Sequence, residues 1–274
     1  MSGLGARVLT AVVLAGVAFS CLFAGAYPLM ALLWLFAIGS LWEFTTLAQN
    51  YQNLQSTNPL PDKIMVVAMG SVVYFVLSGI FMGWLPSISW ALLPPLLMLA
   101  AVKEIYAQPM GIFVRFGLYL SGILYTVVPL AMVNAIAQFQ QTYQPLVVLG
   151  VFFLIWSNDT GAYFAGKYLG KTPLLKRISP KKTWEGSIGG AVLTLLIALI
   201  AYWLVPALSL IDWLVVAALS IVVGTWGDLA ESMLKRNVNV KDSGTILPGH
   251  GGVLDRLDAV YMVIPFVWAW LVMS

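Results

Sequence analysis

The chain has 274 residues, of which 61% are hydrophobic and only 9% are charged. Its mean hydropathy of +0.91 excludes a soluble globular protein, because roughly a quarter of the residues of such proteins are charged. We therefore predict an all-α, polytopic integral membrane protein. The formal net charge of +3 says little by itself, and we expect no nucleic acid partner.

Apolar runs close to the roughly 20 residues that cross a bilayer indicate the membrane helices. The fourth run is short and contains Pro94-Pro95, which removes two backbone donors and should kink or break that helix. The nine expected helices cover about residues 8–26, 29–48, 64–83, 87–102, 113–137, 146–165, 186–207, 212–236 and 257–273.

The first of these runs has features of a cleavable signal peptide, since Arg7 precedes it and Ala24-Gly25-Ala26 follows it. A run of nearly twenty apolar residues is long for such a peptide, so we expect a retained first helix. Cys21 is the single cysteine. An intrachain disulfide and a CxxC metal site are therefore excluded.

The basic residues predict the orientation, because cytoplasmic loops collect Lys and Arg. With the N-terminus inside, all fourteen cations fall on the cytoplasmic side, and we predict that the C-terminus is outside. This charge distribution favours anionic lipid headgroups and anionic substrates. The cations are Arg7, Lys63, Lys103, Arg115, Lys167, Lys171, Lys176, Arg177, Lys181, Lys182, Lys235, Arg236, Lys241 and Arg256.

Charged residues are unevenly distributed along the chain. Residues 157–258 carry eighteen of the twenty-five charges, and no internal repeat is visible. We therefore expect one integral membrane domain over 1–274, in which 1–110 is mainly helical scaffold and 111–274 is the catalytic half.

Two acids interrupt apolar helices. A carboxylate such as Asp159 or Asp228 costs at least roughly 2.5 kcal/mol at the centre of a bilayer unless it is paired or hydrated. Each lies eight residues before a cation, Lys167 or Arg236, which corresponds to about 12 Å of helix. We predict that the two acids meet at one depth in a functional site; the alternative is a neutralised pair that serves helix packing.

The helix that contains Asp228 has a polar face. Asp228, Glu231, Ser232 and Lys235 follow the i, i+3, i+4 and i+7 spacing and point the same way.

The loop after this helix is rich in glycine. Gly249, Gly251 and Gly252 permit positive φ, so successive N–H groups can line a concavity for phosphate oxygens. Asp255 and Asp258 lie one turn apart at the start of the last helix and suit Mg²⁺, which binds through one or two carboxylates plus substrate phosphates. The alternative is that they only complement the helix dipole.

Two further features leave their alternatives open. His250 could contact phosphate or act as acid or base, because histidine titrates near neutrality, or it could only cap a turn. The basic segment 167–190 could be a topology signal alone. It could instead bind substrate through Lys181 and Lys182, since Thr183-Trp184-Glu185-Gly186 opens a helix whose free N–H groups suit an anion.

The stretch from Ser232 to Asp258 resembles the signature of the phosphatidate cytidylyltransferases, also called CDP-diacylglycerol synthases. Ser-Pro-Lys-Lys-Thr-Trp-Glu-Gly at 179–186 and Asn158-Asp159 are similar to other motifs of that family. Every fixed position of the 27-residue signature is matched, by Ser232, Lys235, Arg236, Lys241, Asp242, Gly244, Leu247, Pro248, His250, Gly251, Gly252, Asp255, Arg256 and Asp258.

The resemblance implies that CTP and phosphatidic acid become CDP-diacylglycerol and pyrophosphate, with Mg²⁺, in a homodimer of the bacterial cytoplasmic membrane. A second metal or a monovalent cation stays open. Membrane lipids are the remaining expected partners. The expected catalytic residues are Asp228, Asp255, Lys235, Asp242 and His250; the substrate-binding residues are Lys181, Lys182, Ser232, Arg236, Lys241, Gly251, Gly252 and Arg256; the metal ligands are Asp228, Asp255, Asp258 and Asp159.

Two rival functions fit parts of the sequence. A CTP-dependent polyprenol kinase would use the same nucleotide but transfer the γ-phosphoryl group. An ion-coupled transporter would use Asp159 and Asp228 as intramembrane relays, although the chain has no inverted repeat.

Overall fold

A computed structural model describes residues 3–51, 59–106, 112–247, 249 and 251–274. It is almost entirely helical there, with one two-stranded sheet. Each of the nine predicted ranges contains a helix. The elements are α1 (Gly3–Ala24), α2 (Ala26–Asn50), α3 (Pro59–Phe81), η2 (Ser87–Leu92), α4 (Leu93–Tyr106), α5 (Ile112–Gly122), η3 (Ile123–Val127), α6 (Val128–Ala137), η4 (Phe139–Gln141), α7 (Pro145–Leu169), β1 (Pro173–Leu175), β2 (Ser179–Thr183), α8 (Trp184–Leu204), α9 (Leu210–Asn237) and α10 (Leu254–Met273).

Seven stretches of the described chain are long and apolar enough to cross a membrane. They are α2, α3, the continuous helix of α5 to α6, and α7 to α10, while Thr10–Ala24 and Ser87–Leu99 are shorter apolar helices. The outer faces carry large apolar side chains, such as Trp203, which is 82% exposed. A polytopic all-α membrane protein is thus confirmed, whereas the number of nine spans stays a prediction.

Proline explains two local irregularities. The chain is a 3₁₀-helix in η2 and becomes α-helical at Leu93, so Pro94-Pro95 occupies the first turn of α4. Proline is tolerated there because the first N–H groups of a helix have no intrahelical acceptor. The break therefore comes before the prolines. Pro129 similarly follows the π-helical turn η3, which absorbs the missing backbone hydrogen bond within one long helix.

The described chain forms two compact units. The first contains the chain up to Ala135 and Asn237–Arg256; the second contains Ile136–Arg236 and Leu257–Ser274. This division does not follow the expected boundary between 110 and 111. The single integral domain stays a prediction.

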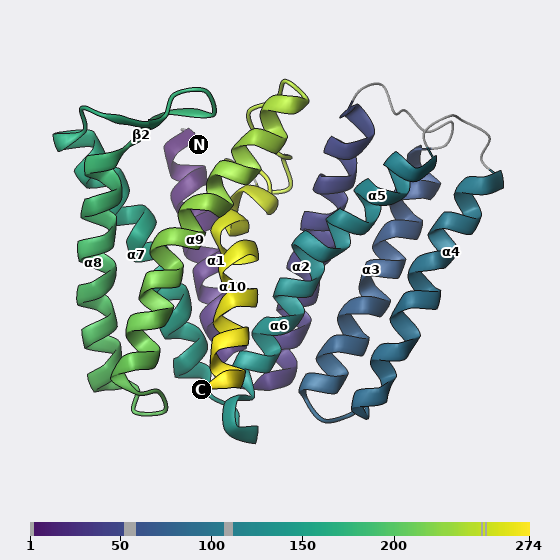
Figure 1. The fold of residues 1–274 in the computed structure, drawn as a ribbon, viewed down its shortest axis with the longest axis horizontal. Coiled ribbons are helices and arrows are strands. Elements are labelled where there is room, and N and C mark those ends of the chain that lie inside the picture. Colours follow the sequence, from purple (N-terminus) through teal and green to yellow (C-terminus); the bar gives the residue numbers. More distant parts are fainter. Residues whose placement is uncertain (1–2, 52–58, 107–111, 248, 250) are drawn as a thin grey trace. The chain divides into compact units, whose positions relative to one another are not determined.

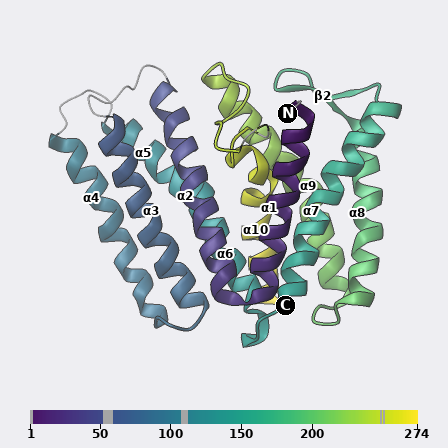
Figure 2. The ribbon, with the colours of Figure 1, turned by 180° about the vertical axis from the view of Figure 1, so that it is seen from behind.

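In the first unit, α2 packs against α3, and α4 packs against α3 and α5 (Figures 1 and 2). The core of this unit contains a cluster of polar side chains that are hydrogen-bonded to one another. The hydroxyl of the fully buried Tyr74 donates to the carbonyl of Met30 at 2.8 Å and accepts from Nδ2 of Asn134 at 2.9 Å. Asn134 also donates to Ser78 at 3.0 Å. These bonds offset the cost of placing polar groups among apolar side chains.

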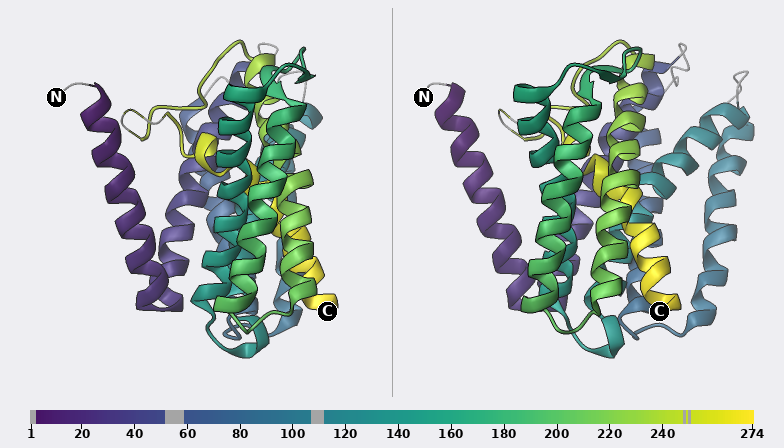
Figure 3. Two further views of the ribbon diagram at one scale, coloured as in Figure 1. Left: turned by 90° about the vertical axis from the view of Figure 1, so that its left-hand side faces the viewer. Right: turned by 60° about the vertical axis from the view of Figure 1, so that its left-hand side comes forward.

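In the second unit, α7, α8 and α9 run alongside one another (Figure 3). Glycines let α7 and α8 approach closely. A Cβ on Gly161 would lie 2.9 Å from Cα of Gly190 and 3.0 Å from the carbonyl oxygen of Gly189. Helices in lipid have no hydrophobic driving force for association, so they rely on van der Waals packing, which small residues make possible at such contacts.

The helix starts of this unit are capped by nearby side chains. Thr183 accepts a hydrogen bond from the N–H of Gly186 at 3.1 Å and so caps α8. Ser209 and Asp212 bond reciprocally at the start of α9, and Asp212 also accepts from Nε1 of Trp270 at 3.0 Å. These caps fix where both helices begin.

The α7–α8 contact gives a stability prediction. Gly161→Val should lower the midpoint of thermal unfolding in detergent by roughly 3 to 10 °C, because overpacking a tight contact costs about 1–3 kcal/mol. Gly16→Val on α1 is the matched control, since a Cβ there meets nothing within 4 Å. Equal midpoints for the two variants would contradict the proposed close packing.

Candidate active site

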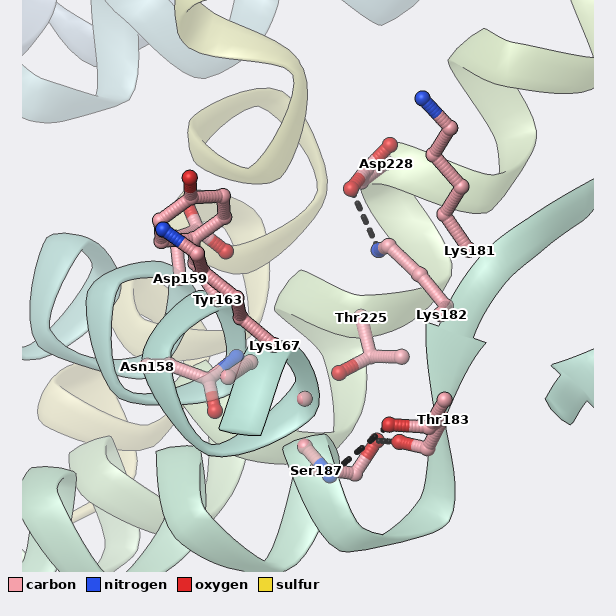
Figure 4. A pocket seen from close by; sticks show the side chains of 13 residues that line it. Asn158, Asp159, Tyr163, Lys167, Lys181, Lys182, Thr183, Ser187, Thr225 and Asp228 are labelled. Carbon is pink, nitrogen blue, oxygen red and sulfur yellow. Dashed lines mark hydrogen bonds and ion pairs between the residues drawn. The ribbon is translucent and has the colours of Figure 1, made fainter. Parts of the chain in front are cut away.

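A cavity of about 420 Å³ opens in the second unit, where side chains from α7, β2 and α9 face one another (Figure 4). Helix α7 contributes Asp159 and Lys167, strand β2 contributes Lys181 and Lys182, and α9 contributes Asp228. The predicted convergence of Asp159 and Asp228 is therefore seen, because both acids line the same cavity.

An ion pair crosses this cavity between Nζ of Lys182 and Oδ2 of Asp228 (Figure 4). Lys182 is held by the hairpin in which β1 pairs antiparallel with β2. The hairpin is anchored from α8, because the Glu185 carboxylate accepts from the N–H groups of Lys171 and Thr172 at 3.1 Å. The basic segment thus has a defined structure that places one of its cations on an acid of the apolar helix α9.

Three carboxylates gather beside the cavity. One oxygen from each of Asp228, Glu231 and Asp258 lies within 4.8 Å of the others. Gly227 makes this possible, since a Cβ there would lie 2.7 Å from the carbonyl oxygen of Asp258 and 3.0 Å from Cα of Ala259. Helices α9 and α10 therefore touch backbone to backbone at the position where their acids meet.

The polar face of α9 supports this cluster. Nζ of Lys235 lies 2.8 Å from Oε2 of Glu231, whose side chain is only 2% exposed. The hydroxyl of Ser232 donates to Oδ1 of Asp228 at 3.3 Å. The face predicted from helical spacing is present, and its cation and hydroxyl contact its two acids.

Asp255 lies in the first unit and is bound by the glycine-rich loop. Its carboxylate accepts from the N–H of Ser243 at 2.9 Å and from the N–H of Gly252 at 2.9 Å. Gly252 therefore directs its N–H to a protein carboxylate in this structure. Asp255 as a metal ligand and Gly252 as a phosphate donor stay predictions.

The same loop forms an open groove of about 430 Å³. Lys241, Asp242, Gly249 and Gly251 are among the residues that line it. Gly249 and Gly251 have φ values of 76° and 83°, which L side chains rarely adopt. The N–H of Leu247 donates to the carbonyl of Gly251 at 3.0 Å and closes the turn. The positive φ expected at these two glycines is confirmed, whereas the expectation for Gly252 is wrong, because its φ is not positive.

Three further residues of the predicted site are Arg236, Arg256 and His250. Arg236 and Arg256 are exposed near the end of α9 and the start of α10. His250 lies outside the described residues, as does Pro248 of the signature.

Two acids were not among the predicted site residues. Glu231 belongs to the carboxylate cluster, and its spacing of three from Asp228 could have indicated it. Glu43 is 2% exposed in α2 and accepts from groups of the glycine-rich loop. A single acid within an otherwise apolar run was the available signal for Glu43.

The donor set fits a hard divalent cation. Three carboxylates within 4.8 Å offer the oxygen ligands that Mg²⁺ prefers, and Mg²⁺ keeps free positions for water and phosphate. Lys182 adds a positive charge on one side, which suits an anionic ligand. The arrangement can hold a phosphorylated substrate together with a cation.

Fold and site together define a membrane-embedded protein with an acidic cluster beside a basic cavity. The chain belongs to the cytidylyltransferase family, whose sequence profile matches residues 5–274. It is 52% identical over 117 residues to a phosphatidate cytidylyltransferase of Bacillus subtilis, and this match covers 42% of the chain and 43% of that protein.

Similar relatives occur in other bacteria. A phosphatidate cytidylyltransferase of Haemophilus influenzae is 42% identical over 125 residues, which are 44% of the chain and 43% of that protein. One of Staphylococcus haemolyticus is 44% identical over 122 residues, 44% of the chain and 46% of that protein. The matched segment thus spans less than half the length of these curated relatives.

The carboxylate cluster predicts a change in cation affinity. Glu231→Gln should weaken binding of Mn²⁺, used as a paramagnetic substitute for Mg²⁺, by about 10- to 100-fold, because a charged oxygen ligand is lost. Electron paramagnetic resonance titration of the purified protein measures this affinity. Asp212→Asn, at the other end of α9, is the matched control and should bind as the wild type does. Unchanged affinity in Glu231→Gln would remove Glu231 from the site.

Proposed function

We propose that this protein is a phosphatidate cytidylyltransferase that converts CTP and phosphatidic acid into CDP-diacylglycerol and pyrophosphate in phospholipid biosynthesis. The observation that carries the proposal is the cluster of Asp228, Glu231 and Asp258 beside a cavity that contains Lys182. Membership of the cytidylyltransferase family and the names of the bacterial relatives support it.

The cation of the proposed reaction is Mg²⁺. Asp228, Glu231 and Asp258 would hold it, and Asp159 lines the adjoining cavity. When bound, Mg²⁺ would withdraw charge from the phosphate oxygens of CTP and orient them. Asp255 as a metal ligand, and a second metal or monovalent cation, remain part of the proposal.

The reaction needs no protein nucleophile. A phosphate oxygen of phosphatidic acid forms a bond to the α-phosphorus of CTP, while the bond from that phosphorus to the oxygen bridging the β-phosphorus breaks. The electron pair leaves with pyrophosphate. Such transfers depend mainly on positioning and on neutralising charge. Lys182 and Lys181 would neutralise the lipid phosphate, while Lys235 and Arg236 of the same unit would neutralise phosphates of CTP. Substrate binding by Lys241 and Arg256 of the first unit is a separate part of the proposal.

The surroundings of the cavity suit a lipid substrate. Tyr163 lines the cavity and is 62% exposed; Trp184 and Ile188, which follow the lining residues Thr183 and Ser187 in the sequence, are 56% and 63% exposed. Apolar side chains of this kind can border acyl chains while the headgroup meets the lysines. The lipid would stay in the bilayer throughout the reaction.

The remaining parts of the proposal concern the setting of the enzyme. Nine spans with the N-terminus inside would put all fourteen cations of the chain on the cytoplasmic side. That side is where CTP is available in a bacterium, so we place the reaction at the cytoplasmic face of the inner membrane. A homodimer is proposed from family resemblance.

Isotope transfer tests the reaction directly. Protein in phosphatidic acid vesicles with Mg²⁺ receives CTP labelled at either the α- or the γ-phosphorus. We expect the α label to enter lipid and the γ label to leave as pyrophosphate. Asp228→Asn should lower the rate by about 100-fold or more, because it loses both a charged ligand and the partner of Lys182.

Each other outcome of this experiment would contradict the proposal in its own way. Transfer of the γ label to lipid would make the protein a lipid kinase. No label in lipid, together with cation-dependent uptake by sealed vesicles, would indicate transport. Asp212→Asn serves as the matched acid-to-amide control and should keep its activity.

Lys182 predicts a specific effect on lipid use. Lys182→Ala should raise KM for phosphatidic acid in mixed micelles by roughly 10- to 100-fold, because a hydrogen bond between charged groups contributes about 1.5–3 kcal/mol. Lys176→Ala is the control, since Lys176 is exposed in the turn between β1 and β2 and does not line the cavity. Equal effects of the two changes would reduce the role of Lys182 to general surface charge.

A further inference from the structure

Glu43 is a buried acid that the proposed reaction does not use. It lies in the second half of α2, and its side chain is 2% exposed. Its Oε2 accepts from the N–H of Leu254 at 2.9 Å and from the hydroxyl of Ser243 at 3.2 Å. These partners are 211 and 200 residues away along the chain. The acid therefore joins the N-terminal helices to both ends of the glycine-rich loop.

Glycine allows the loop to close around this carboxylate. A Cβ on Gly244 would lie 2.6 Å from Cδ and 2.8 Å from Cγ of Glu43. A Cβ on Gly252 would lie 2.8 Å from the same Cδ. Contacts under 3.0 Å are incompatible with a side chain, so these two positions need glycine for the approach of Glu43, although neither has a positive φ. Gly39, one helical turn before Glu43, extends this contact. A Cβ there would lie 3.4 Å from Cγ2 of Val253.

A second carboxylate holds the same parts of the loop from the other side. Asp255 accepts from the N–H groups of Ser243 and Gly252. Ser243 thus uses its hydroxyl for Glu43 and its N–H for Asp255. Gly244, Gly249 and Gly251 lie between these anchors along the chain, Lys241 and Asp242 directly precede Ser243, and all five line the open groove. The shape of the groove therefore depends on two acids, one of which comes from α2.

We propose that Glu43 is a positioning residue that holds Ser243, Gly244 and Gly252, and with them the groove lined by Lys241 and Asp242, in the form that binds the phosphates of CTP. This inference rests on the proposed function for the identity of the ligand. A carboxylate that served only helix packing would have all its partners on neighbouring helices. Glu43 accepts from the N–H of Leu254, the first residue of α10, but also from the hydroxyl of Ser243 in the loop. Its removal leaves both donors without this acceptor.

The test combines a measurement of loop opening with enzyme kinetics. Hydrogen exchange of purified Glu43→Ala should be at least about 10-fold faster over residues 243–254 and unchanged over 145–169. The reason is that only donors in the first segment lose the acceptor that Glu43 provides. KM for Mg²⁺-CTP should rise by roughly 10- to 100-fold, because binding must first order the loop. This factor should be larger than the factor by which kcat falls.

Two further variants keep the test decisive. Glu43→Gln retains one oxygen acceptor and should restore exchange and KM part of the way towards the wild type; it replaces Glu43→Ala if that variant does not fold. Thr45→Val is the matched control on the same helix, because Thr45 is 1% exposed and donates to the carbonyl of Leu41 in its own helix. It should behave as the wild type does.

The outcomes separate the two proposals. Wild-type exchange over 243–254 in Glu43→Ala, or an unchanged KM for CTP, would overturn the role of Glu43 even if the wild type transfers the α label. Faster loop exchange in Glu43→Ala with no transfer by the wild type would leave Glu43 as the anchor of the loop and refute the reaction. An equal increase in Thr45→Val would also overturn the inference.

Discussion

The cost of placing carboxylates inside membrane helices governs this structure. An acid within the hydrocarbon region must be paired, hydrated or bound to a cation. Asp228 is paired with Lys182, Glu231 with Lys235, and Glu43 with a hydroxyl of the glycine-rich loop and the first N–H of α10. Each pairing draws a segment to a particular helix: the hairpin to α9, the end of α9 to its own acid, and the loop to α2. These acids therefore position the hairpin and the loop, and two of them, Asp228 and Glu231, also belong to the carboxylate cluster.

The same constraint explains why the signature stretch is so dense. Its residues belong to both units, because the chain leaves the second unit after Arg236, forms the loop in the first, and returns at Leu257. Each unit has its own acidic anchor within this stretch, Asp258 in one and Asp255 in the other. Residues that lie close together in the sequence thus take part in two separate sets of contacts. The stretch should therefore not be treated as the ligand set of a single site.

The sequence predicted the helices well because each required only an apolar run of sufficient length. It also predicted that Asp159 and Asp228 would meet, since both are intramembrane acids near the same end of their helices. It did not predict the β1–β2 hairpin, whose strands have three and five residues and no alternating pattern. Glu43 was missed because its partners are about 200 residues distant, and Gly227 because close approach is visible only once α9 and α10 are packed.

Gly227 has a consequence for how this protein can vary. Any side chain there would press on the backbone of α10 at Asp258 and separate the acids without altering one of them. Random mutagenesis should therefore find inactive proteins whose full complement of acids, lysines and signature residues is intact. In engineering, the spacing of the carboxylates is adjustable through this one position, independently of their identity.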